Sequence, residues 1–412
     1  MPSRLRQSVH KTVSMQCLQW HRRCLRLSST RQDEGDVMSS TTTVPVNGAH
    51  RFAHIDAMRA YAVLVVVVAH AGAGAVVPGG SGVTIFFTIS GFIITFLLLR
   101  ERDKTGGFSV VGFYRRRAFK IAPPFLVAIV IPTILFAAAG GALNWNASLA
   151  QVFFVFNWLK IDGVPDVLPG SGVVWSLSIE EQFYIIFAIV WLLLVRRRYW
   201  AQATVAIAVF AILASTSLRI FLASMEGQES RIYYGSDTRL DGIAWGMLLA
   251  VGYFMWVKRG ERPTWYSKML ASDLLLIAAI LLYVASLLLR DEWFRETFRF
   301  TLQSIAAAVV IVYGLLPGSG PIRRAFYAMS LWRPIALVGL ASYSIYLVHL
   351  VAASAMRGVL LTLPSYVSFG VILGLGIALG IAMYYAIELP AQRLRVKLEA
   401  KSRERQPEPI LK

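Results

Sequence analysis

Long apolar segments recur along most of the chain, and they constrain the fold more than any other feature. A helix needs roughly 20 mostly apolar residues to cross the hydrocarbon core of a bilayer. Ten segments approach that length, with clusters of Arg and Lys between them. We therefore predict an all-α fold, a polytopic membrane bundle of about ten helices, at approximately 56–72, 82–99, 118–138, 178–195, 202–223, 238–257, 271–289, 300–316, 335–353 and 366–387.

Composition supports this class of protein and argues against two others. The chain is 56% hydrophobic with a mean hydropathy of +0.58, more than a soluble core of this size needs. Its net charge of +18 lies in short clusters instead of one stripe, so we expect no nucleic-acid partner. The only cysteines, Cys17 and Cys24, lie in a polar N-terminal extension, which argues against a disulfide framework.

The distribution of basic residues predicts the orientation. The first connection, Gly72–Ser81, is uncharged, and the third, Ala139–Leu177, has Lys160 as its one basic residue. The alternate connections are rich in Arg and Lys, as in Arg100–Arg117 and Arg196–Arg198. Because basic loops stay on the cytoplasmic side, this alternation places both termini in the cytoplasm.

The chain divides into three parts by composition. Residues 1–50 predict a disordered basic tail, and Met38 is an alternative start that would leave 1–37 untranslated. Residues 51–390 form one transmembrane domain, without an internal repeat or an appended soluble domain, and 391–412 form a basic cytoplasmic tail.

Two polar residues bracket the apolar run of the first helix. Arg59 and His70 are eleven residues apart, which places them on one helical face about 16 Å apart along the axis. A histidine within a membrane span is costly unless it has a partner, and it can act as a general base near neutral pH. A histidine hydrogen-bonded inside the bundle fits this spacing equally well.

A basic element opens the third helix. It contains Arg115, Arg116, Arg117 and Lys120. Such a cluster commonly anchors topology or holds anionic lipid. It also has the chemistry of a phosphate site, because guanidinium and ammonium groups bind phosphates well.

Acidic residues begin the fourth helix, just after Trp175. Ser178 and Glu181 fit a capping box, which would explain the presence of the Glu181 carboxylate on structural grounds. Glu180 has no such explanation, and an acid near the membrane suggests a polar cavity there. Solvated acids at the membrane edge are the alternative.

Small and paired polar residues have simpler explanations. Ser90 and Gly91 in the second helix are typical of close helix packing, which is the favoured interpretation. Arg239 and Asp241 in the sixth helix favour a structural ion-pair network.

The predicted topology sorts the polar residues into two levels. The ninth helix supplies Tyr346 and His349, and Pro390 is expected to end the tenth. One level then holds His70, Glu180, Arg239, Asp241 and His349; the other holds Arg59, Arg115, Arg116, Arg117, Lys120 and Glu388. Acids and imidazoles near one face and cations near the other suit an anionic donor from the cytoplasm and an acceptor on the far side.

Six motifs in this order resemble the membrane-bound acyltransferase 3 family over about residues 52–390. Members include O-acetyltransferases acting on lipopolysaccharide, exopolysaccharide, Nod factors and macrolides. The motifs are Asp56-x-x-Arg59 with His70 eleven residues on, Phe86-Phe-x-x-Ser-Gly-Phe92, the Phe-Tyr-Arg-Arg-Arg element, Trp175-Ser-Leu-Ser-Ile-Glu-Glu-Gln-Phe-Tyr184, Thr238-Arg-x-Asp-Gly242, and Ser342-Tyr-Ser-Ile-Tyr-Leu-Val-His349.

The resemblance implies acyl transfer from acetyl-CoA or another acyl-CoA to a hydroxyl of a glycan or glycoside, in the cell membrane and without a metal. It implies catalytic roles for Arg59 and His70, and we expect Glu180 to assist His70. We expect the donor to be bound by Arg115, Arg116, Arg117 and Lys120. We expect the substrate cavity to be lined by Ser90, Trp175, Glu181, Arg239, Asp241, Tyr346 and His349.

Two departures from the family bear on these expectations. Relatives often have Arg-x-x-Arg where this chain has Arg117-Ala-Phe-Lys120, and Lys keeps the charge without the bidentate fork. Some relatives carry an esterase-like domain, so we expect this chain to act alone or to pass its acyl group to a separate partner protein.

Rival functions remain open on the sequence alone. A transporter or a flippase of lipid-linked sugars also has charges within the membrane, although it more often shows broken helices in repeated halves. A membrane sensor or scaffold without chemistry is a third class.

Overall fold

The computed structural model describes residues 52–260 and 264–404, and within them the chain is helical with no strand. The predicted N-terminal tail, with both cysteines and Met38, lies outside the described residues. So does the end of the predicted C-terminal tail.

Seven described helices are long and apolar enough to cross a membrane. This confirms a multi-pass membrane protein of the all-α class. Their bounds are Ala53–Ala73 (α2 and η1), Gly79–Thr105 (α3), Val110–Ala138 (α4, η2 and α5), Ser171–Leu194 (η3 and α8), Trp200–Leu222 (α9), Glu229–Lys258 (α10 and α11) and Ser365–Lys401 (α20, η4 and most of α21).

The remaining predicted spans are helical but depart from a simple crossing. α17 (Arg333–Leu340) and α18 (Ser342–Ala355) qualify together, and they are bent by 73°. The candidate span predicted over 335–353 is therefore a bent pair of helices in the structure. The bend lets α17 pack on α2 while α18 packs on α20. α13 (Asp273–Leu288) and α15 (Arg299–Leu315) coincide with two predicted spans but are shorter apolar helices of 16 and 17 residues.

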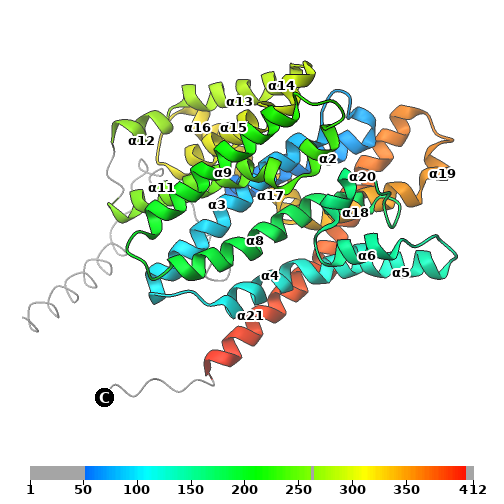
Figure 1. Ribbon diagram of the computed structural model, residues 1–412, viewed down its shortest axis with the longest axis horizontal. Coiled ribbons are helices and arrows are strands. Elements are labelled where there is room, and N and C mark those ends of the chain that lie inside the picture. Colours follow the sequence, from blue (N-terminus) through cyan, green and yellow to red (C-terminus); the bar gives the residue numbers. More distant parts are fainter. Residues whose placement is uncertain (1–51, 261–263, 405–412) are drawn as a thin grey trace, which may run out of the picture. The chain divides into compact units, whose positions relative to one another are not determined.

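Short helices join these elements (Figure 1). The short helices are α6 (Trp145–Val152), α7 (Phe156–Ile161), α12 (Trp265–Leu270), α14 (Glu292–Glu296), α16 (Pro321–Leu331) and α19 (Arg357–Leu360). The apolar segment Leu149–Trp158 is too short to cross a bilayer and runs from α6 into α7.

α8 shows how an apolar helix meets two environments. Its buried residues, such as Phe183, Phe187 and Trp191, recur at a spacing of four and face the core. Its exposed residues, such as Ile186 and Leu193, are equally apolar. A helix that is apolar all round and half exposed is stable only against lipid.

α3 is the central helix of the bundle. It packs against α2, α8, α11 and α15, and 72% of its apolar window is buried. α11 lies so close that a Cβ added to Gly91 would stand 2.0 Å from the Ile243 carbonyl oxygen. The interpretation of Gly91 as a packing residue is therefore confirmed.

Two predicted helix ends were wrong. The α8 helix begins at Val174, so Ser178 lies inside it and donates a hydrogen bond to the Val174 carbonyl instead of capping. Pro390 does not end the tenth span. A π-helical turn, Tyr384–Glu388, leads directly into α21 (Leu389–Glu404), and Pro390 occupies the first turn of α21. The π-helical turn just before Pro390 changes the backbone hydrogen-bond pattern there, so the helix continues past a residue that has no backbone N–H.

Candidate active site

A cavity of about 330 Å³ opens among α2, α3, α4, α8, α18 and α21. We call it the arginine cavity, because its basic lining residues are Arg59, Arg116, Arg117, Lys120 and Arg395. The α4 residues in its lining are spaced by three and four positions and form one helical face. Arg115 lies off that face and pairs instead with Glu399 on α21, at 3.4 Å.

Some of these cations have partners. Arg116 binds Glu101 at 2.8 Å. Lys120 forms an ion pair with the fully buried Glu388, which also accepts a hydrogen bond of 2.6 Å from the Ser344 hydroxyl. Glu101 and Glu388 do not line the cavity. They therefore neutralise Arg116 and Lys120 without occupying the cavity themselves.

The other cations have free donors. The Nε atoms of Arg59 and Arg395 are buried and lack a hydrogen-bond partner among the described residues. The Arg117 guanidinium lies 3.6 Å from the centre of the Tyr184 ring, a stacking contact that leaves its N–H groups available. Unpaired guanidinium groups around a cavity favour an anion with several oxygens, such as a phosphate.

Glu180 is the acidic residue of this lining. It accepts hydrogen bonds from the Ser90 hydroxyl at 3.0 Å and from the Tyr184 hydroxyl at 3.2 Å. The sequence predicted that Glu180 lies at the same depth in the membrane as His70, and this prediction was wrong. Because α8 begins at Val174, Glu180 lies about 9 Å into the helix and reaches the arginine cavity.

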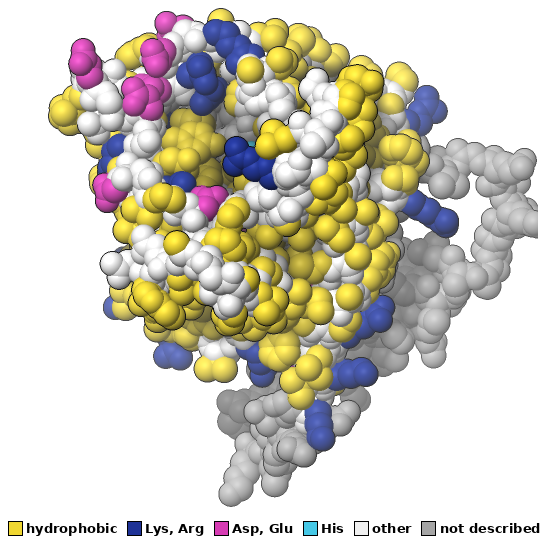
Figure 2. All heavy atoms as spheres, turned by 90° about the vertical axis from the view of Figure 1, so that its right-hand side faces the viewer, with side chains coloured by type: hydrophobic (Ala, Val, Ile, Leu, Met, Phe, Trp, Pro, Cys, Tyr) yellow, Lys and Arg dark blue, Asp and Glu magenta, His cyan; other side chains and the backbone are white. Residues whose placement is uncertain are grey.

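A second cavity, of about 350 Å³, contains His70, and we call it the histidine cavity. Lys160 and Asp166 line it as an ion pair of 3.2 Å. Its aromatic lining is Trp175 packed against Tyr233 and Tyr234, with ring centres 5.0 and 5.1 Å away. Figure 2 views one end of the molecule and shows a hollow with an apolar floor and charged side chains around it.

His70 is held by a second histidine. It lies in a π-helical turn, Ala69–Ala73, that ends the first span, and its side chain is exposed in the cavity. Its Nδ1 is 3.0 Å from Nε2 of the buried His349, whose Nδ1 is 3.1 Å from the Ile345 carbonyl oxygen.

This chain of contacts assigns the hydrogens. The Ile345 carbonyl can only accept, so His349 Nδ1 carries a hydrogen. A fully buried imidazole without a carboxylate partner is most stable when neutral, so His349 Nε2 accepts from His70 Nδ1. Nε2 of His70 is then left with a free lone pair, the state that a general base requires.

The two cavities share one wall. Val83 and Tyr346 appear in the lining of both, and both are buried. The Tyr346 hydroxyl lies 2.6 Å from the Ser176 hydroxyl and 3.1 Å from the Val173 carbonyl oxygen. These contacts hold the ring across the boundary between the cation-lined space and the space that contains His70.

The remaining predicted cavity residues line neither space. Asp241 is buried in a bidentate ion pair with Arg219, at 2.8 and 2.9 Å. Arg239 is buried beside the Phe300 ring at 3.7 Å and donates to Thr84 and to the Tyr233 carbonyl, so it supports the aromatic wall from behind. Glu181 has a buried oxygen without a partner among the described residues.

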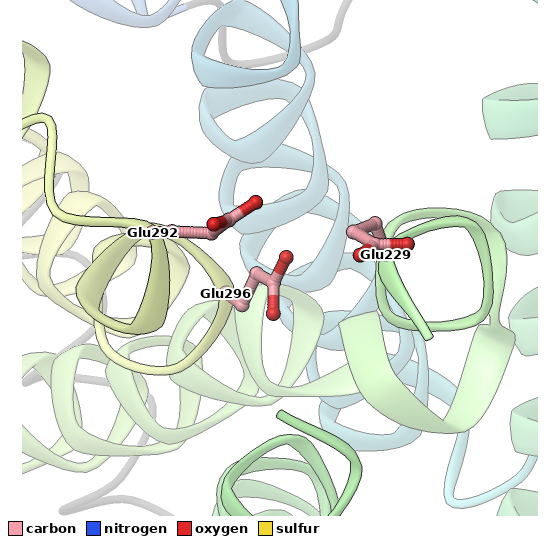
Figure 3. Close-up of side chains that lie close together, drawn as sticks. All are labelled: Glu229, Glu292 and Glu296. Carbon is pink, nitrogen blue, oxygen red and sulfur yellow. The ribbon is translucent and has the colours of Figure 1, made fainter. Parts of the chain in front are cut away.

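A group of three acids lies elsewhere. Figure 3 shows Glu229 from α10 gathered with Glu292 and Glu296 from α14. One carboxylate oxygen of each lies within 4.8 Å of the other two. Two of the three are exposed. Burial first, and then the charges of the other two acids, raise the pKa of Glu296. Carboxylates alone do not define a metal centre, and we assign none here.

Several lining residues were missed in the sequence. Lys160 and Tyr233 lie in the six-residue helices α7 and α10, and Asp166 lies in the loop after α7; segments this short carry too little periodicity to indicate which face a residue occupies. Arg395 was assigned to a tail. Its spacing from Gln392, three residues, was a readable signal of a helical face, but Pro390 was interpreted as a stop.

The protein-family model described as "Acyltransferase domain" (Acyl_transf_3) matches residues 52–385 of this chain. The chain belongs to the acyltransferase 3 family. The sequence resemblance is therefore confirmed, and its motif residues Arg59, His70 and Glu180 are among those that line the two cavities.

Curated relatives are O-acetyltransferases by name. O-acetyltransferase OatA of Staphylococcus aureus (strain NCTC 8325 / PS 47) is 29% identical over 307 residues, covering 72% of this chain and 49% of the relative. A protein of S. aureus strain COL, provisionally named an O-acetyltransferase, is 30% identical over 370 residues, covering 83% and 58%. The chain thus spans about half the length of these relatives. No solved structure matches it significantly.

Proposed function

We propose that this acyltransferase domain transfers an acetyl group from cytoplasmic acetyl-CoA to a hydroxyl of a glycan or glycoside beyond the cell membrane. The observation that carries the proposal is the shared wall. A cation-lined cavity and a cavity with a basic imidazole nitrogen meet at Val83 and Tyr346. The names of the relatives support O-acetyl transfer as the reaction.

The arginine cavity suits the donor. Acetyl-CoA carries several phosphates at one end of a long flexible arm and the thioester at the other. Arg59, Arg117 and Arg395 offer free donors to the phosphates. The arm then extends toward Tyr346, with the thioester at the boundary of the histidine cavity.

The histidine cavity suits a sugar hydroxyl. Trp175, Tyr233 and Tyr234 supply apolar ring faces, and Lys160 and Asp166 supply polar contacts. Binding sites for small polar molecules combine apolar walls with a few placed polar groups in this way.

The chemistry follows from the tautomer of His70. Its Nε2 takes the proton from the acceptor hydroxyl while that oxygen bonds to the thioester carbonyl carbon. The carbon–sulfur bond breaks, and the sulfur leaves with a proton returned by His70. His349 holds the ring in the tautomer that makes this transfer feasible.

The orientation in the inner membrane belongs to the same proposal. Arg102 at the end of α3 donates to the Val195 carbonyl, just before Arg196–Arg198, and Lys258 at the end of α11 pairs with Asp103, so these basic residues lie at the end of the bundle where α3 leads into α4. With basic connections in the cytoplasm, both termini are cytoplasmic and the arginine cavity opens to the pool of acyl-CoA.

The test uses purified full-length protein in lipid nanodiscs with acetyl-CoA labelled in the acetyl group and a simple glycoside acceptor. We expect His70→Ala to lower acetyl transfer by about 10²- to 10⁴-fold, the usual contribution of a general base. The variant must keep the elution profile and melting temperature of the parent. Full transfer by a folded His70→Ala protein, or transport of glycoside without thioester consumption by the parent, contradicts the proposal.

A further inference from the structure

The C-terminal helix α21 is part of the wall of the arginine cavity. It continues from α20 through the π-helical turn and packs along α4 (Figure 1). Gln392 and Arg395 line the cavity, and Glu399 reaches Arg115 on α4 at 3.4 Å. Their spacing of three and four residues places all three on one face of α21.

Each neighbouring contact on this face has a structural role. Gln392 donates to Glu388 at 3.1 Å, and Glu388 in turn pairs with Lys120 on α4. The Arg115–Glu399 pair fastens the helix on the far side of Arg395. α21 is therefore held against α4 at two points, one on each side of Arg395.

Arg395 is different, because its charge is not used by the protein. It is partly buried, its Nε is buried without a hydrogen-bond partner, and no ion pair involves it within the part of the chain that the structure describes. Arg393 and Lys397, on the same helix, are exposed and do not line the cavity. A buried N–H left unpaired in a cavity wall is costly unless a ligand accepts its hydrogen bond.

We propose that α21 completes the donor site and that Arg395 binds a phosphate group of the acyl donor. Arg395 lies beyond residues 52–385, the part of the chain that the family model matches. The proposal rests on the proposed function for its donor and names one more binding residue for it. A lipid headgroup carries the same phosphate chemistry, so the experiment separates the two sources.

The experiment compares Arg395→Gln with Arg393→Gln in the full-length protein. We expect Arg395→Gln to raise the KM for acetyl-CoA on the order of 10- to 100-fold with kcat nearly unchanged, because a binding contact is lost equally from the ground and transition states. Arg393→Gln, which removes the same charge from the exposed face, should leave both constants unchanged. Arg395→Lys should recover part of the affinity, since it keeps the charge without the fork.

A phosphate-free donor distinguishes binding from a structural role. S-acetylpantetheine has the thioester and the arm but no phosphate, so its KM should be the same for the parent and Arg395→Gln. An equal loss with both donors overturns the proposal, because it shows that the helix has merely shifted. The assays are run in vesicles of phosphatidylcholine with and without phosphatidylglycerol, and an effect of Arg395→Gln that requires phosphatidylglycerol identifies a lipid headgroup and also overturns it.

Failure of the two proposals is distinguishable. A parent protein that uses acetyl-CoA, with an unchanged KM in Arg395→Gln, overturns the role of Arg395 and leaves the proposed function intact. A parent that neither binds nor consumes acetyl-CoA overturns the proposed function, and the role of Arg395 with it. Parent binding of 3′,5′-ADP that Arg395→Gln weakens, with Arg393→Gln unaffected, supports the phosphate contact even where transfer is absent.

Discussion

Two groups of buried charge in this protein are built in opposite ways. Around Asp241, the Arg219 guanidinium is fully used, donating to both carboxylate oxygens, to Thr301 and to the backbone of Thr297 and Thr238. Around the arginine cavity, Arg59 and Arg395 keep free donors. A guanidinium whose donors are all used packs helices together, whereas one with free donors beside a cavity is available to a ligand.

The largest effect expected from this comparison is on stability. Asp241→Ala leaves Arg219 buried without its carboxylate, which should lower the free energy of unfolding by about 3–5 kcal/mol. The measurement is the melting temperature of the detergent-solubilised protein. Asp237→Ala is the matched control on the same helix: Asp237 pairs with Arg231 nearer the surface, at 2.5 Å, so its loss should cost less than about 1 kcal/mol. Equal melting temperatures for the two variants would show that the buried ion pair contributes no more to stability than the pair nearer the surface.

The second effect should appear in activity and not in stability. Arg59→Gln removes from the arginine cavity a cation whose Nε has no hydrogen-bond partner among the described residues, so we expect the KM for acetyl-CoA to rise about 10-fold or more, with an unchanged melting temperature. Acetyl-transfer kinetics and thermal melting are measured on the same preparation. A strong loss of stability in Arg59→Gln would mean that Arg59 belongs with Arg219 as a packing residue.

The smallest effect belongs to the group of three acids near the surface. The raised pKa of Glu296 means that the folded protein holds this proton more tightly than the unfolded chain does. Stability should therefore fall as pH rises from the ordinary glutamate value through the raised one. Glu296→Gln should remove that fall, making the variant more stable at neutral pH by on the order of 0.5 kcal/mol or less.

Melting temperatures across this pH range provide the check, with Glu226→Gln as the control, because Glu226 is exposed and outside the group of three acids. A pH dependence that persists in Glu296→Gln would assign the proton to another group.

Helix positions were predictable because apolar length is a local property. All ten predicted segments are helical in the structure, and the four-residue periodicity of α4 identifies which of its basic residues share a face. Arg115 was included with its neighbours because they are adjacent in sequence, but a turn of about 100° per residue points it away from the cavity.

Depth and pairing across helices were not predictable. Ser178 was interpreted as the cap of α8, and a start four residues earlier moves Glu180 from the level of His70 to that of Arg59. Pro390 was interpreted as a stop, and the π-helical turn before it instead carries the chain on to Arg395. Each error came from a local rule overridden by contacts with distant helices.

By itself, the sequence determined that the chain is a multi-pass membrane bundle with Arg59 and His70 on one face of its first helix. Apolar length and helical periodicity suffice for both. Only the tertiary structure decided that His349 selects the tautomer of His70, that Tyr346 divides two cavities, and that α21 brings Arg395 to the donor side. These facts depend on how helices hundreds of residues apart pack against one another, and no local pattern encodes that packing.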